Sequence, residues 1–305
     1  MIAARIHRFG APSVIQYDDV EAVAPEPDEV LVEVAAASFN PSELGLRRGL
    51  LQTIAPVSLP YTLGWDLAGT VVEVGTRVSD LAAGHRVVGL VDGGAAAEYA
   101  TVPAASLVPA PRTVPLPDSA TLPLAGLTAW QAVFEHARVR AGQRVLVNGA
   151  GGGVGGFAVQ LAKHAGAEVV ATAGRRSAAR LRRFGADQLV DHTAGPLRAS
   201  VDSPVDTILN LVPLDPPGID ELVALVGPGG TVVSATPVRS ATGAEVNAVH
   251  FVTRRDTAQL AALVELVDAG AVAVEVTRSY PLTQLDQLHR DCEEGRVHGK
   301  VTVCV

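Results

Sequence analysis

Glycine is concentrated in one short stretch of the chain, between an apolar run and a helical pattern. The run at 144–147 carries β-branched residues and leads into five glycines within positions 149–155, after which 154–164 has helical spacing. A second apolar run at 168–173 completes a strand, turn, helix and strand. Glycine tolerates positive φ and lets a backbone approach a ligand closely, and the N–H groups that open a helix bind anions. The stretch therefore predicts a turn that binds the diphosphate of a dinucleotide.

The glycines of this turn can be read in two registers, and the sequence does not separate them. The first register is G-x-G-x-x-G and the second has a glycine at every third position. The two sets are Gly151, Gly153 and Gly156, and Gly149, Gly152 and Gly155. A glycine-rich loop can also be a plain turn, but the strand before it and the helix and strand after it favour the dinucleotide interpretation.

The residues after the second strand indicate which dinucleotide is bound. An NAD site usually carries Asp or Glu about 20 residues past the glycines, where the carboxylate accepts hydrogen bonds from ribose hydroxyls. Here Gly174, Arg175 and Arg176 stand in that region, and no carboxylate occurs between residues 172 and 177. Guanidinium groups match a phosphate, and glycine leaves room for it. The alternative is a solvated helix start, but we expect NADPH, without distinguishing between the two arginines.

Length, composition and charge limit the class of protein. With 305 residues, 48% of them hydrophobic, the chain is long enough for two globular domains. A net charge of −8 argues against general nucleic-acid binding, which needs a basic surface. No apolar run approaches a membrane-spanning length and the first residues do not resemble a signal peptide, so we expect a cytoplasmic protein without membrane contact.

The potential metal ligands are few and scattered. Cys292 and Cys304 are the only cysteines, and the eight histidines form no metal-binding spacing. Two cysteines cannot form a four-cysteine structural zinc site. The sequence therefore predicts no metal.

The periodicity of the chain predicts two architectures. Residues 1–118 carry short β-branched runs broken by Pro, Gly and Asp, which suit a strongly bent sheet or small barrel, with strands expected over 2–6, 29–35, 69–74, 86–90 and 97–102. Residues 119–266 alternate strands with helices and suit a doubly wound parallel sheet. Its six strands are expected over 144–147, 168–173, 188–190, 205–211, 230–235 and 246–252. Helices are expected over 120–137, 154–164, 219–226, 257–269 and 282–294, and a last strand over 299–305.

The sequence resembles a known family over nearly its whole length. The matching segments include FNPSE (39–43), LGWDLAGTVVEVG (63–75), LPLAGLTAWQA (122–132), RVLVNGAGGGVG (144–155) and GKVTV (299–303). They resemble the zinc-independent quinone oxidoreductases of the medium-chain dehydrogenase/reductase superfamily. The resemblance implies a GroES-like catalytic domain of residues 1–118 and 267–305 and a Rossmann NADPH-binding domain of residues 119–266. It also implies a homodimer, in which 230–252 could pair edge to edge.

The resemblance bears on metal binding as well. Zinc-dependent relatives carry a cysteine and a His-Glu pair where this chain has Asn40 and Trp65-Asp66. An amide and an indole cannot replace a thiolate and an imidazole as zinc ligands, so the comparison supports a site without metal.

The residues of the cofactor site are likewise implied by the resemblance. Asn40 and Thr128 would lie near the nicotinamide, Asn210 beside the nucleotide and Lys300 close to the cofactor. The main chain of Phe251 and Val252 would face the carboxamide. The residues beneath the pyrophosphate would be Asn148, Gly149, Gly151, Gly152, Gly153 and Val154, and the 2′-phosphate would lie on Arg175 and Arg176. Other interpretations stay open, because Asn40 precedes a proline and suits a turn, Thr128 could bond a helix carbonyl and Lys300 could be a surface residue.

The reaction that follows is hydride transfer from NADPH to a quinone or to the β-carbon of an α,β-unsaturated carbonyl. Hydrogen-bond donors could stabilise the negative charge that develops on the acceptor oxygen. Tyr61 is the best candidate for a proton donor, and solvent is the alternative. Two rival functions remain: an NADPH-binding redox sensor or scaffold with little turnover, and an enoyl-thioester reductase that would need a basic groove, for which Arg47 and Arg48 are the candidates.

Overall fold

The computed structural model describes residues 1–237 and 246–305. They form two compact units, the first of residues 1–124, 255–269 and 274–305 and the second of residues 125–254 and 270–273. The expected boundaries at 118/119 and 266/267 differ from this division mainly at helix α7 (Thr257–Asp268). The Asp268 carboxylate at the end of α7 accepts the backbone amides of Arg112 and Thr113 at 2.7 and 3.0 Å, which attaches α7 to the first unit.

The first unit consists mainly of antiparallel strands. One sheet has the order β2–β1–β4, and a larger one has the order β15–β16–β3–β5–β6–β8, with β7 also paired to β3. The strands are β1 (Ile2–Ile6), β2 (Ile15–Asp19), β3 (Glu29–Ser38), β4 (Tyr61–Thr62), β5 (Asp66–Val74), β6 (Arg86–Leu90), β7 (Tyr99–Pro103), β8 (Leu107–Pro109), β15 (Val276–Pro281) and β16 (Lys300–Cys304). The helices are α1 (Ser42–Arg47), α2 (Leu116–Ser119), α7 and α8 (Leu285–Glu293), with 3₁₀ turns at Pro12–Val14, Ala104–Ser106 and Leu282–Gln284.

The tail of the chain belongs to this unit through strand pairing. β16 pairs antiparallel with β3, which places Thr302 opposite Ser38, and it pairs parallel with β15. Burial alternates along most of β3 and is continuous over the first four residues of β16, and these strands supply valines of the core, including Val30, Val32 and Val303. The strand predicted for the last residues therefore joins the N-terminal part of the chain.

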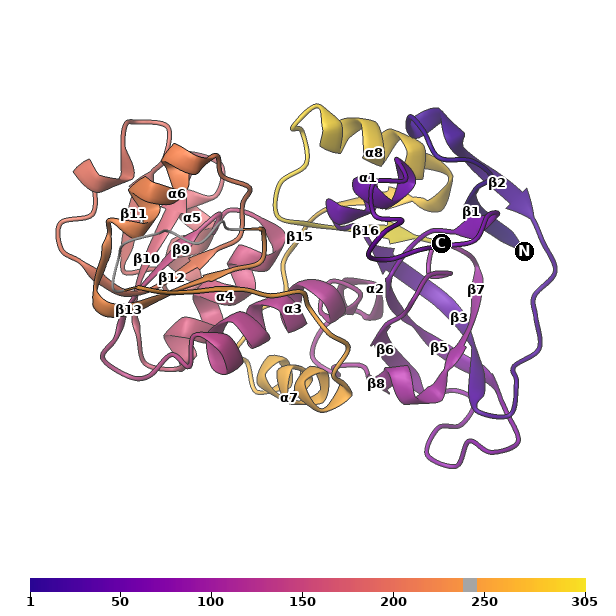
Figure 1. Cartoon of the computed structure of the whole chain (residues 1–305). Helices are drawn as coiled ribbons and strands as arrows, with labels where there is room; N and C mark the ends of the chain where they lie inside the picture. Colours follow the sequence, from indigo (N-terminus) through magenta and orange to yellow (C-terminus); the bar gives the residue numbers. More distant parts are fainter. Residues whose placement is uncertain (238–245) are drawn as a thin grey trace. The chain divides into compact units, whose positions relative to one another are not determined.

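The second unit contains the predicted doubly wound sheet. Within the described residues its strand order is β11–β10–β9–β12–β13–β14, and every neighbouring pair is parallel. Strands β9 to β13 are labelled in Figure 1. This is the 3-2-1-4-5-6 order of dinucleotide-binding folds, whose switch point lies between the first and fourth strands, here β9 and β12. The strands are β9 (Arg144–Asn148), β10 (Glu168–Ala173), β11 (Gln188–Asp191), β12 (Val205–Asn210), β13 (Val226–Ser234) and β14 (Asn247–His250).

Helices of the second unit agree with the predicted pattern except near its start. They are α3 (Pro123–Trp130), which begins at the unit boundary, α4 (Gly153–His164), α5 (Ala178–Arg183) and α6 (Pro216–Val223), with a 3₁₀ turn at Leu197–Ala199. The helical stretch expected over 120–137 is found over 123–136, but it starts later and is not an α-helix throughout. Pro123 opens α3, and the chain then continues as a π-helix, η3 (Gln131–His136), in which the Ala137 amide donates to the Ala132 carbonyl five residues back at 3.0 Å.

No helix among the described residues combines the length and the apolar character that crossing a bilayer requires.

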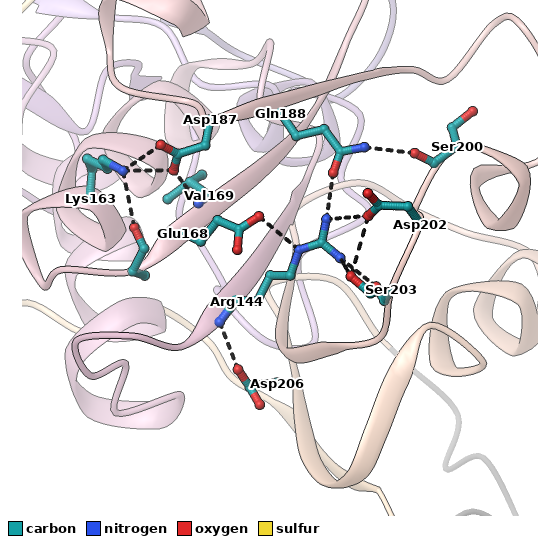
Figure 2. Close-up of polar contacts among 11 residues, drawn as sticks. Arg144, Lys163, Glu168, Val169, Asp187, Gln188, Ser200, Asp202, Ser203 and Asp206 are labelled. Atoms are coloured by element: carbon teal, nitrogen blue, oxygen red, sulfur yellow. Dashed lines mark hydrogen bonds and ion pairs between the residues drawn. The ribbon is translucent and has the colours of Figure 1, made fainter.

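At the amino-terminal edge of the parallel sheet, the side chain of Arg144, the first residue of β9, makes hydrogen bonds to groups of neighbouring strands (Figure 2). All three guanidinium nitrogens donate to groups at or near the starts of neighbouring strands. The acceptors are the side chains of Glu168 (3.1 Å), Gln188 (2.7 Å), Asp202 (2.7 Å) and Ser203, and the carbonyl of Ser203 (2.7 Å). The backbone amide of Arg144 also donates to Asp206 at 2.7 Å. One cation thus joins the starts of β9, β10, β11 and β12.

We expect Arg144→Met to lower the melting temperature by about 4–8 °C, because hydrogen bonds to charged groups contribute about 1.5–3 kcal/mol and several acceptors would lose their donor. Arg140→Met is the matched control, since Arg140 lies four residues earlier and is exposed. Differential scanning calorimetry of both variants checks this, and equal melting temperatures for the two would contradict the role of Arg144.

Candidate functional site

The glycine turn lies between β9 and α4. Gly149 has φ +84°, which favours glycine, and its amide donates to the Thr172 hydroxyl at 2.8 Å. The Gly152 amide then donates to the Gly149 carbonyl at 3.0 Å, and Gly152 is the N-cap of α4. No side chain of the described residues caps this helix. Within residues 1–237 and 246–305, the first-turn amides of Gly153, Val154 and Gly155 therefore have neither a capping side chain nor an intrahelical acceptor, and they can bind an anion.

The packing of the turn distinguishes the two glycine registers. A Cβ at Gly155 would lie 2.4 Å from the Gly149 carbonyl oxygen and 2.5 Å from the Ala150 Cα, so α4 can approach β9 only with glycine there. Gly149 provides the tight turn and Gly152 the N-cap, where an added Cβ would meet only the Gly149 oxygen, at 3.3 Å, among the described atoms. Turn, close phosphate approach and helix packing are the three roles of the dinucleotide glycines. The register of Gly149, Gly152 and Gly155 fills them in order.

Beyond β10, the predicted 2′-phosphate residues lie close to this turn. A Cβ at Gly151 would lie 2.9 Å from the Ser177 hydroxyl oxygen, so the residues that follow Arg175 and Arg176 contact the glycine turn. Gly174 accepts the Ser177 amide at 3.0 Å, and both arginines are exposed. The turn and the arginine pair are thus neighbours in one unit.

Buried Arg180 is a residue that the sequence interpretation missed. Its Nη2 donates to the Gly151 carbonyl at 2.6 Å, which ties α5 to the glycine turn. An arginine in a helix with other arginines gave no signal that this one would point inward.

Polar side chains form a ladder along the carboxyl ends of four neighbouring strands. Asn148 Nδ2 donates to Asn210 Oδ1 at 2.9 Å, across the switch point between β9 and β12. Thr172 Oγ1 lies 3.2 Å from Asn148 Oδ1, and Asn210 Nδ2 lies 3.0 Å from Ser234 Oγ and 3.2 Å from Thr236 Oγ1. Asn148 and Asn210 were expected beside the nucleotide, and their amides are used inside the protein to align the strand ends. Thr172 and Ser234 were missed, although a polar residue closing a buried strand is a signal that could have found them.

The remaining predicted residues of this unit lie on α3 and on the segment after β14. Thr128 is buried, with its hydroxyl oxygen 2.6 Å from that of Thr253. The Phe251 amide donates to the Ser234 carbonyl at 3.1 Å, so that amide is used within the protein, while Val252 is 80% exposed. Both residues follow β14 at the carboxyl edge of the sheet.

The first unit has its own buried polar centre, around the Asp66 carboxylate. Asp66 is fully buried and accepts Ser38 Oγ at 2.5 Å, Asn40 Nδ2 at 2.9 Å and the Leu124 amide at 2.7 Å. Lys300 Nζ lies 3.5 Å from the same carboxylate and donates to Asn40 Oδ1 at 3.1 Å. Lys300 is therefore a buried cation and not a surface residue.

Asn40 is fixed at both ends of its side chain by this centre. Its Nδ2 contacts Asp66 and, at 3.4 Å, the Ser38 carbonyl, while its Oδ1 accepts from Lys300. Both amide protons are thus directed to acceptors of the protein, and the side chain retains acceptor capacity only. The centre holds Asn40 rigidly in place.

Glu43 lies beside this centre, in the first turn of α1, and is buried. Burial raises its pKa to about 8, the Asn40 amide that donates to Oε1 at 3.0 Å opposes the rise, and the charge of Asp66 adds to it. Burial also lowers the pKa of Lys300, against the charges of Asp66 and Glu43. Near neutral pH Glu43 is therefore mostly protonated.

The hydroxyl of Tyr61, the expected proton donor, makes two hydrogen bonds within the protein. Its hydroxyl donates to the Asp92 carbonyl at 2.5 Å and accepts the Trp65 indole N–H at 3.1 Å. Burial raises the pKa of Tyr61 to about 12. A phenol with that pKa is a weak proton donor at neutral pH.

The residues at the positions of zinc ligands do not form a zinc-binding set. An amide, an indole and one carboxylate stand there, in Asn40, Trp65 and Asp66, and the carboxylate is already paired with the Lys300 ammonium. Across residues 1–237 and 246–305 no three His, Cys, Asp or Glu side chains come together as metal ligands would.

Comparisons with known proteins agree with both units. The family model described as "Alcohol dehydrogenase GroES-like domain" matches residues 26–112, and the one described as "Zinc-binding dehydrogenase" matches residues 184–303. The quinone oxidoreductase of Mus musculus is 32% identical over 97% of this chain and 95% of its own length. The chain belongs to the quinone oxidoreductase family of the medium-chain dehydrogenases/reductases.

Solved structures of this family have the same fold. The quinone oxidoreductase from Coxiella burnetii is 29% identical, with a TM-score of 0.88 over 100% of this chain and 99% of its own. A mycobacterial protein, Rv1454c, solved in complex with NADPH, is 25% identical, with a TM-score of 0.88 over the whole of both chains. Membership of the quinone oxidoreductase family makes this chain an oxidoreductase that depends on a nicotinamide cofactor.

The polar centre of the first unit predicts a pH dependence of stability. The folded-state pKa of Glu43, about 8, lies above its ordinary value of 4.5, so between these pH values the folded state binds more protons than the unfolded state. Stability is greatest below pH 4.5 for this group and falls as the pH rises to about 8. Glu43→Gln keeps the acceptor for the Asn40 amide and removes the titration. As the pH rises through this window, we expect the melting temperature of Glu43→Gln to increase relative to that of the wild type.

Melting curves of both proteins between pH 5 and 9 measure the difference directly. A difference in melting temperature that stays constant over that range would show that Glu43 does not titrate in this window.

Proposed function

We propose that the chain is an NADPH-dependent oxidoreductase that transfers a hydride to a quinone or an α,β-unsaturated carbonyl without a metal. The observation that carries the proposal is the glycine turn, in which Gly149, Gly152 and Gly155 leave the first-turn amides of α4 open beside the carboxyl edge of a parallel sheet. Such an edge, at the switch point between β9 and β12, is where dinucleotides bind in this fold. The NADPH complex of the mycobacterial relative supports the choice of coenzyme.

In this mechanism the protein's residues bind and orient. The amides of Gly153 and Val154 would hold the diphosphate at the positive end of α4, and Arg175 or Arg176 would hold the 2′-phosphate. The bound nicotinamide supplies the hydride. Binding the coenzyme and the acceptor in contact removes most of the entropic cost of the transfer.

The proton that completes the reduction would come from solvent. Tyr61 has a pKa of about 12, and its hydroxyl is committed to the Asp92 carbonyl, so it is a poor donor. Its expected role as acid therefore gives way to one in fixing the loop that carries Asp92.

A metal is not required by this proposal. The buried Lys300 side chain contacts Asn40 and Asp66 where zinc-dependent relatives have ligands. The Asp66 carboxylate, which a divalent ion could otherwise bind, is already paired with the Lys300 side chain.

The enoyl-thioester reductase is less well supported, because its basic groove is not available at the candidate residues. Arg47 is fully buried, and its Nη2 pairs with Glu293. Arg48 pairs with the same carboxylate at 2.7 Å. Of the two, only Arg48 is exposed, with 47% of its side chain accessible, and Glu293 pairs with it.

Homodimerisation and a cytoplasmic location complete the proposal. β14 ends the strand order of the sheet among the described residues, so it could pair with β14 of a second copy. Part of the segment 230–252 that was expected to make this contact, residues 238–245, lies outside the described residues.

Preference for NADPH over NADH tests the arginine pair. We expect NADPH to bind about 10–100-fold more tightly, since charge-assisted hydrogen bonds contribute about 1.5–3 kcal/mol, and Arg175→Ala combined with Arg176→Ala to remove the difference. Tryptophan fluorescence quenching measures both affinities. Arg182→Ala is the control, because Arg182 is exposed on the adjoining helix α5. Equal affinities of the wild type for NADPH and NADH would show that the arginine pair does not bind the 2′-phosphate.

Turnover distinguishes an enzyme from a redox sensor or scaffold. We expect steady NADPH oxidation with 1,4-benzoquinone, 9,10-phenanthrenequinone or a simple enone, and no loss of rate after treatment with a metal chelator, because no step depends on a metal. Tight NADPH binding without turnover across this panel would favour the sensor. Loss of activity with the chelator, restored by zinc, would refute the metal-free reaction.

A further inference from the structure

The side chain of Gln131 holds one residue of the segment after β14 at two points. Its Nε2 donates to the Arg254 carbonyl at 3.0 Å, and its Oε1 accepts the Arg254 amide at 3.1 Å. Gln131 is fully buried at the start of η3. A side-chain amide that bonds both the N–H and the C=O of one residue replaces the pair of bonds that a neighbouring strand would make. The backbone at 254 is thereby fixed to the helix.

Three more contacts join the same two segments of the second unit. They are the hydroxyl pair Thr128–Thr253 (2.6 Å), the ion pair Glu135–Arg254 (2.5 and 2.8 Å) and the ring contact His136–Phe251 (centroids 4.5 Å apart). The helical stretch α3–η3 thus contacts three of four consecutive residues. Val252, the fourth, is 80% exposed. We call residues 251–254 the held segment.

The geometry of the π-helix places the residues that make these contacts on one side of it. Residues 135 and 136 follow residue 131 by four and five positions. In η3 the Ala137 amide donates to the carbonyl of Ala132, five positions back. Residues four and five apart therefore lie on one side of this widened turn. That side is the one that contacts the held segment.

The held segment also connects to the coenzyme edge of the sheet. The Phe251 amide donates to the Ser234 carbonyl, and the Ser234 hydroxyl contacts Asn210, which in turn contacts Asn148 at the switch point. Ligands of parallel α/β sheets bind at this edge. Beside it, the main chain at exposed Val252 is held by the contacts of Phe251 and Thr253 on either side, which fix the direction of its carbonyl and amide groups. A carboxamide, which has both a donor and an acceptor, is the ligand group that matches such a backbone.

We propose that Gln131 is a positioning residue for the nicotinamide end of the coenzyme: it fixes the main chain of the held segment against which the carboxamide binds. This role rests on the proposed function. Gln131 itself need not touch the coenzyme. Without its amide, the Arg254 N–H and C=O lose their bonds to Gln131, and the remaining contacts hold the main chain at 254 less closely.

Two ligands separate this role from a general effect on the fold. 2′,5′-ADP carries the adenosine phosphates but no nicotinamide, so it reports on the glycine turn and the arginine pair alone. For Gln131→Met we expect the dissociation constant for NADPH to rise about tenfold and that for 2′,5′-ADP to stay within about twofold of the wild type. In turnover, KM for NADPH should rise more than KM for the quinone.

Two further variants complete the experiment. Gln131→Glu keeps the oxygen that accepts the Arg254 amide, so its NADPH affinity should lie between those of the wild type and Gln131→Met. Gln143→Met is the matched control, because the Gln143 side chain also accepts a backbone amide, that of Arg140 at 2.8 Å, but lies outside the held segment. It should leave both dissociation constants unchanged.

The outcomes separate the two levels of the proposal. Equal weakening of NADPH and 2′,5′-ADP in Gln131→Met would show that Gln131 only supports the fold, and unchanged NADPH affinity would show that it has no role; either result overturns the positioning role alone. A wild-type chain that binds neither ligand would remove the proposed function, and this role with it.

Discussion

The carbonyl oxygen of Gly149 would lie 2.4 Å from a Cβ at position 155, so α4 can pack against the end of β9 only because that position has no side chain. This contact fixes where the first-turn amides of α4 lie. The turn is held from the other side by Thr172, which accepts the Gly149 amide, and by Arg180, which donates to the Gly151 carbonyl. An anion site made of backbone needs such support, because no side chain of its own can adjust to the ligand.

The rest of the second unit keeps the strand ends in register around this contact. At one edge of the sheet Arg144 joins the starts of four strands, and at the other Asn148, Asn210 and Ser234 join the ends of three. The buried amides and hydroxyls of the second edge satisfy one another, so they direct the strands without an unpaired polar group. In the first unit, Asp66 and Lys300 hold the side-chain amide of Asn40 in the same way.

Local features of the fold were predictable from the sequence, whereas the contacts between distant residues were not. The glycine turn and the strands on either side of it follow from spacing within about 30 residues, and the parallel order follows from the alternation of strands and helices. The polar centre joins Ser38, Asp66 and Lys300, which are too far apart in sequence for any periodicity to connect them. The resemblance placed Asn40 and Lys300 near a cofactor but could not show that each satisfies the other. The π-helix was missed because its residues have the same composition as an ordinary helix.

The account depends on the turn at 149–155 receiving a diphosphate. The most direct measurement is a crystal structure of the chain with NADPH. The account predicts diphosphate oxygens within hydrogen-bond distance of the Gly153 and Val154 amides, and the 2′-phosphate on Arg175 or Arg176. A map in which the coenzyme is ordered elsewhere, with this turn empty or covered by side chains, would contradict it.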